Sequence, residues 1–355
     1  MEFSGLIKSY PNGRQLTEAE FLRRLDQKKS ASSEPHYQLC VIKLNSTYLE
    51  SVDKWFGWKG VISAVAIIIF IMFATGYIGL VDVALSRDPN SYGSDNDLVV
   101  LVSAAIIVFP VLMFAIWLLR KESFAYTHYP MRFNRKTRTV HVFRPNGTIL
   151  SVPWDEVFFT MGNLAKWNEW EVRGHVLEPD GFTIRETFAL SHVDMLSTED
   201  ADADTSRSQS SSKDFVRAHW EFVRRYMEDG PQAVSGQVQF CMPIHKNRET
   251  PRVSLERVFA NIAGAPFIIY WMLFPFCGIV SAFRLFAMHT SKIPRWSDEV
   301  EVSCKIDPDD PFAIEGAADG ERIAVFPQAA LAAGVGFQPT TRNSKLDRAK
   351  YSRTQ

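Results

Sequence analysis

The sequence has few cysteines and no cysteine motif. Its four cysteines, Cys40, Cys241, Cys277 and Cys304, are widely separated, and none of them forms a CxxC pair or lies at zinc-site spacing from histidine. A structural zinc site or a disulfide framework would need such spacing or a denser set of cysteines. We therefore expect free thiols in a reducing compartment, with no metal and no other cofactor.

An excess of positive charge is also missing. The chain has 39 Lys and Arg against 40 Asp and Glu, which gives a formal net charge of -1. A general nucleic-acid-binding protein needs a basic excess to neutralise phosphates. We therefore predict no nucleic-acid partner.

Catalytic motifs are absent from the linear sequence. It contains no GxSxG, HExxH, P-loop or GxGxxG pattern, and its histidines occur singly. His141 lies in an alternating segment, which favours a partly exposed strand residue over a catalytic base. Asp155 beside Glu156 is more typical of a turn residue than of an acid pair. These features predict a non-enzymatic protein.

Long apolar segments are what the sequence does have. Residues 60–81 and 98–119 carry no charge, and each exceeds the roughly 20 residues needed to cross a bilayer. Two buried helices of a soluble core would rarely be so uniformly apolar. Because the N-terminus lacks the pattern of a signal peptide, we expect these internal segments to direct insertion.

Charges beside the two segments predict their orientation. The loop between them is short and acidic, whereas the flanks are basic. The flanking basic residues are Lys54, Lys59, Arg120, Lys121, Arg132, Arg135, Lys136 and Arg138. The positive-inside rule then places both flanks in the cytoplasm and the loop in the periplasm.

A third apolar region, residues 258–283, is interrupted by Pro266 and Pro275. The prolines divide it into pieces that are each too short to cross a bilayer, which favours a re-entrant hairpin with both ends in the cytoplasm. A single kinked span with the C-terminus outside is the alternative.

The segment after the second span has the pattern of an antiparallel sheet. Aromatic and β-branched residues alternate with polar ones in residues 124–134, 139–144 and 148–152, and 145–147 is a Pro-Asn-Gly turn. Residues 167–177 and 182–190 form a second pair across a Glu-Pro-Asp-Gly turn. Four or more strands in so short a segment predict a curved sheet or small barrel.

Helices and strands are also predicted around this sheet. A capping box at 211–214 begins a helix in which Trp220 faces the core, and the serine-rich residues 197–212 before it read as a flexible loop. Thr17 begins a short helix that contains Phe21, Leu22 and Leu25. Residues 37–45, 299–306 and 321–326 read as strands, and a basic tail follows.

These elements divide the chain into five predicted regions. They are a cytoplasmic N-terminal region (1–58), a transmembrane helical hairpin (59–120), a cytoplasmic sheet domain (121–250), a re-entrant or third membrane segment (251–290) and a C-terminal region (291–355). The predicted fold class is an α+β membrane protein.

Two resemblances extend this interpretation. The segment YPMRFNRKTRTVHVF with GTILSVPWDEV resembles the opening strands of bacterial pleckstrin-homology-like (PH-like) domains, and the likeness covers roughly residues 124–230. Together with Arg284 and Thr290-Ser291-Lys292-Ile293-Pro294, the layout of residues 50–300 resembles a family of proteobacterial integral membrane proteins, many encoded beside type VI secretion toxins.

The first resemblance implies a binding or scaffold module, by analogy of fold alone. The second implies an immunity or accessory protein of the bacterial inner membrane that binds a cognate toxin or the target of that toxin, with membrane lipids as the other partner. A lipid-binding or envelope-stress sensor is the alternative. The residues expected to contact a partner or lipid headgroups are Arg132, Arg135, Lys136, Arg138, Trp154 and Asp155.

Overall fold

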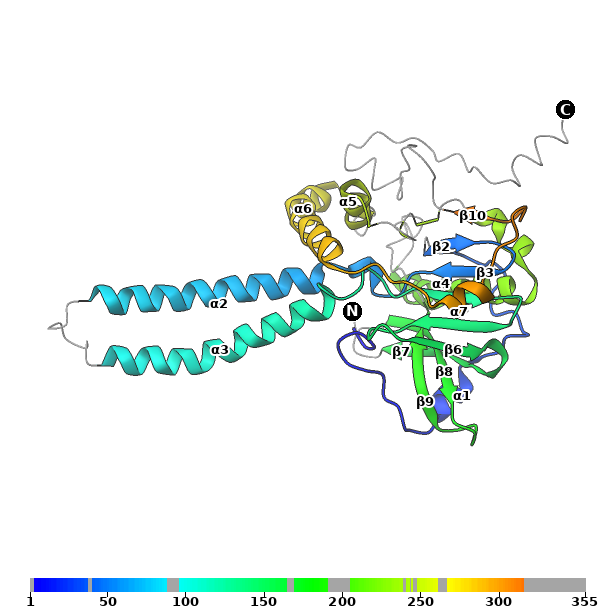
Figure 1. Cartoon of the computed structure of the whole chain (residues 1–355), viewed down its shortest axis with the longest axis horizontal. Helices are drawn as coiled ribbons and strands as arrows, with labels where there is room; N and C mark the ends of the chain where they lie inside the picture. Colours follow the sequence, from blue (N-terminus) through cyan, green and yellow to red (C-terminus); the bar gives the residue numbers. More distant parts are fainter. Residues whose placement is uncertain are drawn as a thin grey trace, which may run out of the picture.

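The computed structural model describes residues 3–37, 40–87, 96–164, 169–190, 205–238, 241–242, 244, 248–260 and 267–315. Two long helices project as a hairpin from a part that is built on two antiparallel sheets (Figure 1). The chain is therefore of mixed α and β structure, as predicted.

The larger sheet has six strands in the order β10-β2-β3-β4-β5-β6. Their bounds are β10 Ile314–Glu315, β2 Val41–Leu44, β3 Tyr48–Ser51, β4 Met131–Asn134, β5 Thr139–Phe143 and β6 Ile149–Pro153. Strands β3 and β4 are neighbours although the helical hairpin lies between them in the sequence. The hairpin is thus an insertion between two adjacent strands of one sheet.

The smaller sheet has four strands in the order β1-β7-β8-β9. Their bounds are β1 Arg24–Leu25, β7 Phe158–Leu164, β8 Glu169–Leu177 and β9 Ile184–Ala189. The amphipathic helix α4 (Thr205–Glu228) packs its apolar residues against strands of both sheets in one core. Trp220 is fully buried there and stacks on Trp154, as its place in the apolar stripe predicted.

The predicted strands are divided between the two sheets. Strands β4 to β6 join the N-terminal strands β2 and β3, whereas β8 and β9 join β7 and β1. The prediction of one curved sheet was therefore too simple, and the PH-like resemblance stays a prediction. Residues 124–130 are not in a strand either, so β4 is shorter than predicted.

Helices α2 (Val61–Ser86) and α3 (Asp97–Glu122) form the hairpin and confirm the two predicted apolar segments as helices. Their apolar side chains point outwards: Ile68, Met72, Ile106 and Met113 are all more than half exposed. Both helices are long and apolar enough to cross a membrane. Pro110 lies within α3 without ending it, because backbone groups that a proline frees can be satisfied locally in a transmembrane helix.

The third apolar region differs from the prediction. Helix α5 (Pro251–Ala260) precedes it, and α6 runs from Phe267 to Thr290 without a break at Pro275. The two pieces that follow Pro266 are therefore one helix, of which Trp271–Thr290 is long and apolar enough to cross a membrane. Residues 261–266 lie outside the described part. The kinked single span agrees better with this length than the re-entrant hairpin does, while Figure 1 shows α6 inclined to the axis of α2 and α3.

Buried charges connect the three apolar helices to the sheets. Arg284 of α6 forms a bidentate ion pair with Glu249, at 2.7 and 3.0 Å, and both side chains are fully buried. The same guanidinium donates to the carbonyl oxygens of Phe56 (2.9 Å) and Lys59 (3.3 Å), just before α2. Lys59 donates in turn to the carbonyl oxygen of Glu122 (2.8 Å), at the end of α3. We call this set of contacts the junction.

The backbone at the junction is packed tightly. Gly60, the N-cap of α2, has a φ of 101°, a conformation that glycine adopts most readily. A Cβ at this position would lie 2.5 Å from the Cα of Arg284. Only glycine therefore allows α2 and α6 to approach each other so closely.

Two predicted elements differ from the structure, and a third lies outside the described residues. Helix α4 begins at Thr205, inside the serine-rich stretch predicted as a loop, because extending an existing helix costs little even for serine; residues 197–204 lie outside the described part. Residues 298–303 form helix α7 (Asp298–Ser303) and not a strand. Ser297 at its N-cap and three acids in its first turn favour the helix over the alternating pattern. The predicted strand at 321–326 lies outside the described residues.

We predict that Glu249→Gln lowers the stability of the full-length protein by about 3 kcal/mol, because it leaves the Arg284 charge buried without its counter-ion. The melting temperature in detergent, followed by tryptophan fluorescence, measures the effect. Asp307→Asn is the matched control, since it removes the acid of an exposed ion pair with Lys136 and should cost less than about 1 kcal/mol. Equal losses in the two variants would contradict the importance of the junction.

Candidate functional site

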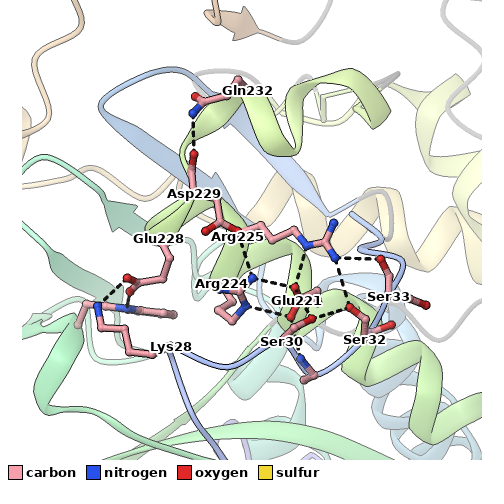
Figure 2. A network of polar contacts seen from close by, with 12 residues as sticks. Lys28, Ser30, Ser32, Ser33, Glu221, Arg224, Arg225, Glu228, Asp229 and Gln232 are labelled. Atoms are coloured by element: carbon pink, nitrogen blue, oxygen red, sulfur yellow. Dashed lines mark hydrogen bonds and ion pairs between the residues drawn. The ribbon is translucent and has the colours of Figure 1, made fainter.

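Three of the predicted contact residues belong to one polar network at the end of α4. Arg138 forms two hydrogen bonds of 2.6 Å with Asp155 and a third, of 2.7 Å, with Glu228. Glu228 also accepts from the indole Nε1 of Trp154 (2.8 Å) and from the ammonium of Lys28 (2.6 Å), shown in Figure 2. These charges satisfy one another, so the network fixes α4 to the strands.

Further along α4, a second carboxylate fixes the N-terminal segment. Glu221 has a fully buried side chain that accepts from Arg224 and Arg225 of its own helix and from Ser30 (Figure 2). Burial works to raise its pKa, but these hydrogen bonds outweigh it and hold the pKa at about 2. The carboxylate therefore stays charged and holds residues 30–33 against α4.

The side chain of Trp154 is not accessible to a partner. Its side chain is fully buried, with its ring centroid 5.6 Å from that of Trp220 and 4.9 Å from that of Phe159. The sequence placed Trp154 at the end of a hairpin, where an exposed position was plausible. The structure makes it a core residue.

Arg132 is fully buried as well. It lies in a polar row that crosses the large sheet, in which Glu50, Arg132, His141 and Ser151 are successive partners on strands β3 to β6. Its guanidinium donates to Glu50 (3.0 Å) and to Glu301 of α7 (3.1 Å). The guanidinium also lies 4.7 Å from the ring centroid of Tyr48 and 4.8 Å from that of Trp296.

A cavity of about 340 Å³ adjoins this row. It is bounded by the segment that follows α6 and by strand β3, and its lining residues are Glu50, His128, Pro130, Ile293, Pro294, Arg295, Trp296 and Glu301. The Ile293-Pro294 part of the motif used for the family resemblance therefore forms one wall. The cavity mixes both charge signs, so its electrostatics select no single ligand class.

The remaining predicted residues lie on the turn between β4 and β5. Lys136 is exposed and pairs with Asp307 at 2.9 Å, and Arg135 is half-buried. Arg132, Lys136 and Arg138 thus each have a carboxylate partner that was distant in the sequence. This pairing leaves the predicted basic cluster with little free charge for anionic headgroups.

A different surface has the features of a binding site. On helix α1 (Glu18–Leu22), Phe21 is 42% exposed and Leu22 is 80% exposed, and Phe182 on the turn between β8 and β9 is 57% exposed. The ring of Phe21 lies 6.4 Å from that of Phe182 and 5.5 Å from that of Phe158. We call Phe21, Leu22 and Phe182 the aromatic patch.

Polar contacts hold α1 in place beneath the aromatic patch. Thr17 and Glu20 form the predicted capping box, and Arg14 donates two hydrogen bonds to Glu20, at 2.8 and 2.5 Å. Burial works to raise the pKa of Glu20, but the hydrogen bonds from Arg14 and Thr17 outweigh it and keep the pKa at about 2. The sequence predicted this helix but placed Leu25 in it, whereas Leu25 lies in β1.

The other side of the aromatic patch is also fixed. Asp180 accepts hydrogen bonds from the backbone N–H groups of Phe182 and Thr183, both at 2.9 Å. A surface that exposes apolar side chains on an ordered backbone loses little entropy when it binds. The aromatic patch is therefore prepared for contact with another molecule.

The charges next to the aromatic patch are mainly basic. Arg23, Arg24 and Arg185 are exposed at neighbouring positions, and the guanidinium of Arg24 lies 5.2 Å from the ring centroid of Phe158. Glu18 is exposed too, whereas Asp180 is occupied by the turn. Apolar side chains with an arginine rim suit a protein surface that is apolar and acidic. Sequence reasoning missed this surface, although Phe-Leu-Arg-Arg at 21–24 was its signal.

Groups that could support catalysis or metal binding are sparse. Among the described residues, no three His, Cys, Asp or Glu side chains come together as a metal site. All four cysteines are buried, and none of them forms a disulfide bond among the described residues. The Sγ of Cys40 lies 3.9 Å from Nε2 of His219, but both side chains are buried in the core, where no substrate can reach them.

Two buried histidines make the fold sensitive to acid. His141, predicted to be partly exposed, is buried and its Nδ1 lies 2.8 Å from the hydroxyl of Ser151. His175 is buried beside Thr187. Burial lowers the pKa of each imidazole to about 4, below its ordinary value of 6.5. The unfolded chain therefore binds more protons than the folded chain between these values.

We predict that the stability of the protein falls as the pH decreases from about 6.5 to about 4, and that His175→Gln removes about 2 kcal/mol of this loss. Melting temperatures at pH 7 and pH 4.5 measure the effect in the full-length protein. His289→Gln is the control, because the side chain of His289 is exposed. If both variants keep the pH dependence of the original protein, then buried His175 does not contribute to it.

Comparison with known proteins places the chain in a family. The model of a family of unknown function (DUF6708) matches residues 108–308, which is more than half of the 355 residues. The matched segment begins within α3 and ends after α7, so it includes Phe182 and the cavity lining apart from Glu50. No match was found among the curated proteins or the solved structures. The chain belongs to the DUF6708 family.

Proposed function

We propose that this chain is a non-enzymatic, membrane-anchored interaction protein that binds a protein partner through the aromatic patch. The observation that carries the proposal is the patch itself. Outside the apolar helices, large apolar side chains are rarely exposed in the described part of this chain, yet Phe21, Leu22 and Phe182 are exposed together. Aromatic residues at the centre of a patch commonly supply most of the binding energy of an interface.

The membrane helices give this surface a fixed place. Because the hairpin of α2 and α3 is inserted between β3 and β4, the sheets have short connections to the membrane anchor. Figure 1 shows α1 and β9 on the part of the molecule away from the projecting hairpin. A partner bound there would be held close to the membrane without entering it.

The identity of the partner follows from the family resemblance in the sequence. The chain resembles inner-membrane proteins that are encoded beside type VI secretion toxins. This resemblance suggests that the partner is a secreted toxin and that the chain is its immunity or accessory protein. In this proposal the sheets face the cytoplasm, in accord with the basic flanks of the spans. The alternative, a lipid or envelope-stress sensor that uses the β4–β5 turn, has less support because its basic residues are paired with acids.

We predict that tagged full-length protein, extracted from native membranes in mild detergent, co-purifies with a protein that is toxic when expressed alone. Phe21→Ser with Phe182→Ser should weaken this complex by about 30-fold or more, because aromatic anchors at an interface contribute about 1 kcal/mol or more each. Val302→Ser is the control, since Val302 is 77% exposed on α7, outside the patch.

Two outcomes would count against the proposal. If the double variant retains its partner as well as the control does, the aromatic patch is not the contact surface. If cells without this gene are no more sensitive to neighbouring toxins, the immunity role is wrong, even where a partner is found.

A further inference from the structure

A second pocket lies where α3 meets the sheets. Its volume is about 470 Å³. One wall is the last apolar part of α3, with Met113, Ile116 and Trp117, and Pro145 of the β5–β6 turn faces it. Because this wall belongs to a helix that is long and apolar enough to cross a membrane, the pocket lies at the edge of the hydrocarbon region.

The rim of this pocket carries two cations that follow the apolar wall. Arg120 and Lys121 occupy the last turn of α3 and both line the pocket. The ammonium of Lys121 lies 5.4 Å from the ring centroid of Trp117, which keeps the charge beside the apolar wall. Within the described part of the chain, neither residue forms an ion pair with a carboxylate, unlike Arg132, Lys136 and Arg138.

The turn opposite α3 is held in place. Arg144 at the start of the turn is paired with Glu186 on β9 through two bonds of 2.6 Å. Gly147 packs directly under the ring of Tyr126, where a Cβ would clash with the phenol oxygen. The pocket is therefore formed before any ligand arrives, which favours binding.

We infer that this pocket binds one anionic phospholipid of the surrounding leaflet. The phosphate group lies between Arg120 and Lys121, and an acyl chain lies along Met113, Ile116 and Trp117. A diester phosphate with a single negative charge complements the two cations, and the apolar wall excludes a small polar anion as the preferred ligand. This site is independent of the protein partner proposed for the aromatic patch.

The test uses the full-length protein in mild detergent with short-chain phosphatidylglycerol and phosphatidylcholine of equal chain length. Native mass spectrometry measures how many molecules of each lipid are retained and at what concentration. We expect one phosphatidylglycerol per chain, bound about tenfold more tightly than phosphatidylcholine. In Arg120→Gln with Lys121→Gln, this preference should disappear, because each charge near an anionic headgroup contributes several-fold in affinity.

Two further variants separate charge from folding. Lys29→Gln with Lys305→Gln removes two exposed cations elsewhere on the chain and should keep the preference. Arg120→Lys with Lys121→Arg retains both charges and should keep it as well. Loss of the preference in either control would overturn the assignment to these two side chains.

A headgroup without acyl chains distinguishes a lipid from a free phosphate compound. Glycerol phosphate should bind far more weakly than phosphatidylglycerol, because it cannot use the apolar wall. Equal binding of glycerol phosphate and the lipid would overturn the lipid assignment. Equal retention of both lipids by the original protein would overturn the inference as a whole.

Discussion

The buried guanidinium of Arg284 joins the apolar helix α6 to the segment that precedes α2. Arg284 is fully buried, so removing its charge from water is costly unless every donor finds an acceptor. Glu249 supplies the counter-charge, and the carbonyl groups of Phe56 and Lys59 supply the remaining acceptors. These carbonyl groups lie in the segment between β3 and α2, just before α2 begins. The hydrogen bonds that Arg284 makes with them therefore also fix where α6 crosses α2. Gly60 allows the two backbones to meet there. The relative positions of the apolar helices therefore follow from hydrogen-bond requirements more than from apolar packing, which has little preference within lipid.

The same requirement extends into the large sheet. Lys59 donates to the carbonyl oxygens of Glu122 and Tyr126, which brings the end of α3 to the start of α2, and β4 begins a few residues later. Strands β3 and β4 can therefore be neighbours despite the long excursion between them. Because the connections are short and ordered, the sheets cannot reorient freely with respect to the helices. A surface on the sheets then has a defined position relative to the apolar helices, which is the property that the proposed interaction function uses.

Some of this architecture could be predicted from sequence because its signals are local. Uninterrupted apolar runs located α2 and α3, and alternation with a Pro-Asn-Gly turn located β5 and β6. Local signals gave a wrong prediction where two of them disagreed. Residues 299–306 alternate between apolar and polar residues as a strand does, but Ser297 and the acidic residues after it favour the start of a helix, and a helix forms. Strand β3 is only four residues long and was missed. The burial of Arg132 could not be predicted, since its acidic partners Glu50 and Glu301 lie 82 and 169 positions away.

Charge pairing separates the basic residues into two groups with different roles. The positive-inside rule uses only the number of Lys and Arg residues near each apolar segment, so it does not distinguish paired from unpaired side chains. In the folded chain, however, Arg132, Lys136 and Arg138 are paired with carboxylates. Arg120 and Lys121 in the last turn of α3, and Arg23 and Arg24 beside the aromatic patch, have no ion pair among the described residues. Each unpaired set adjoins exposed apolar side chains. The fold thus leaves two of the unpaired sets beside apolar surface, one at the end of α3 and the other beside the aromatic patch.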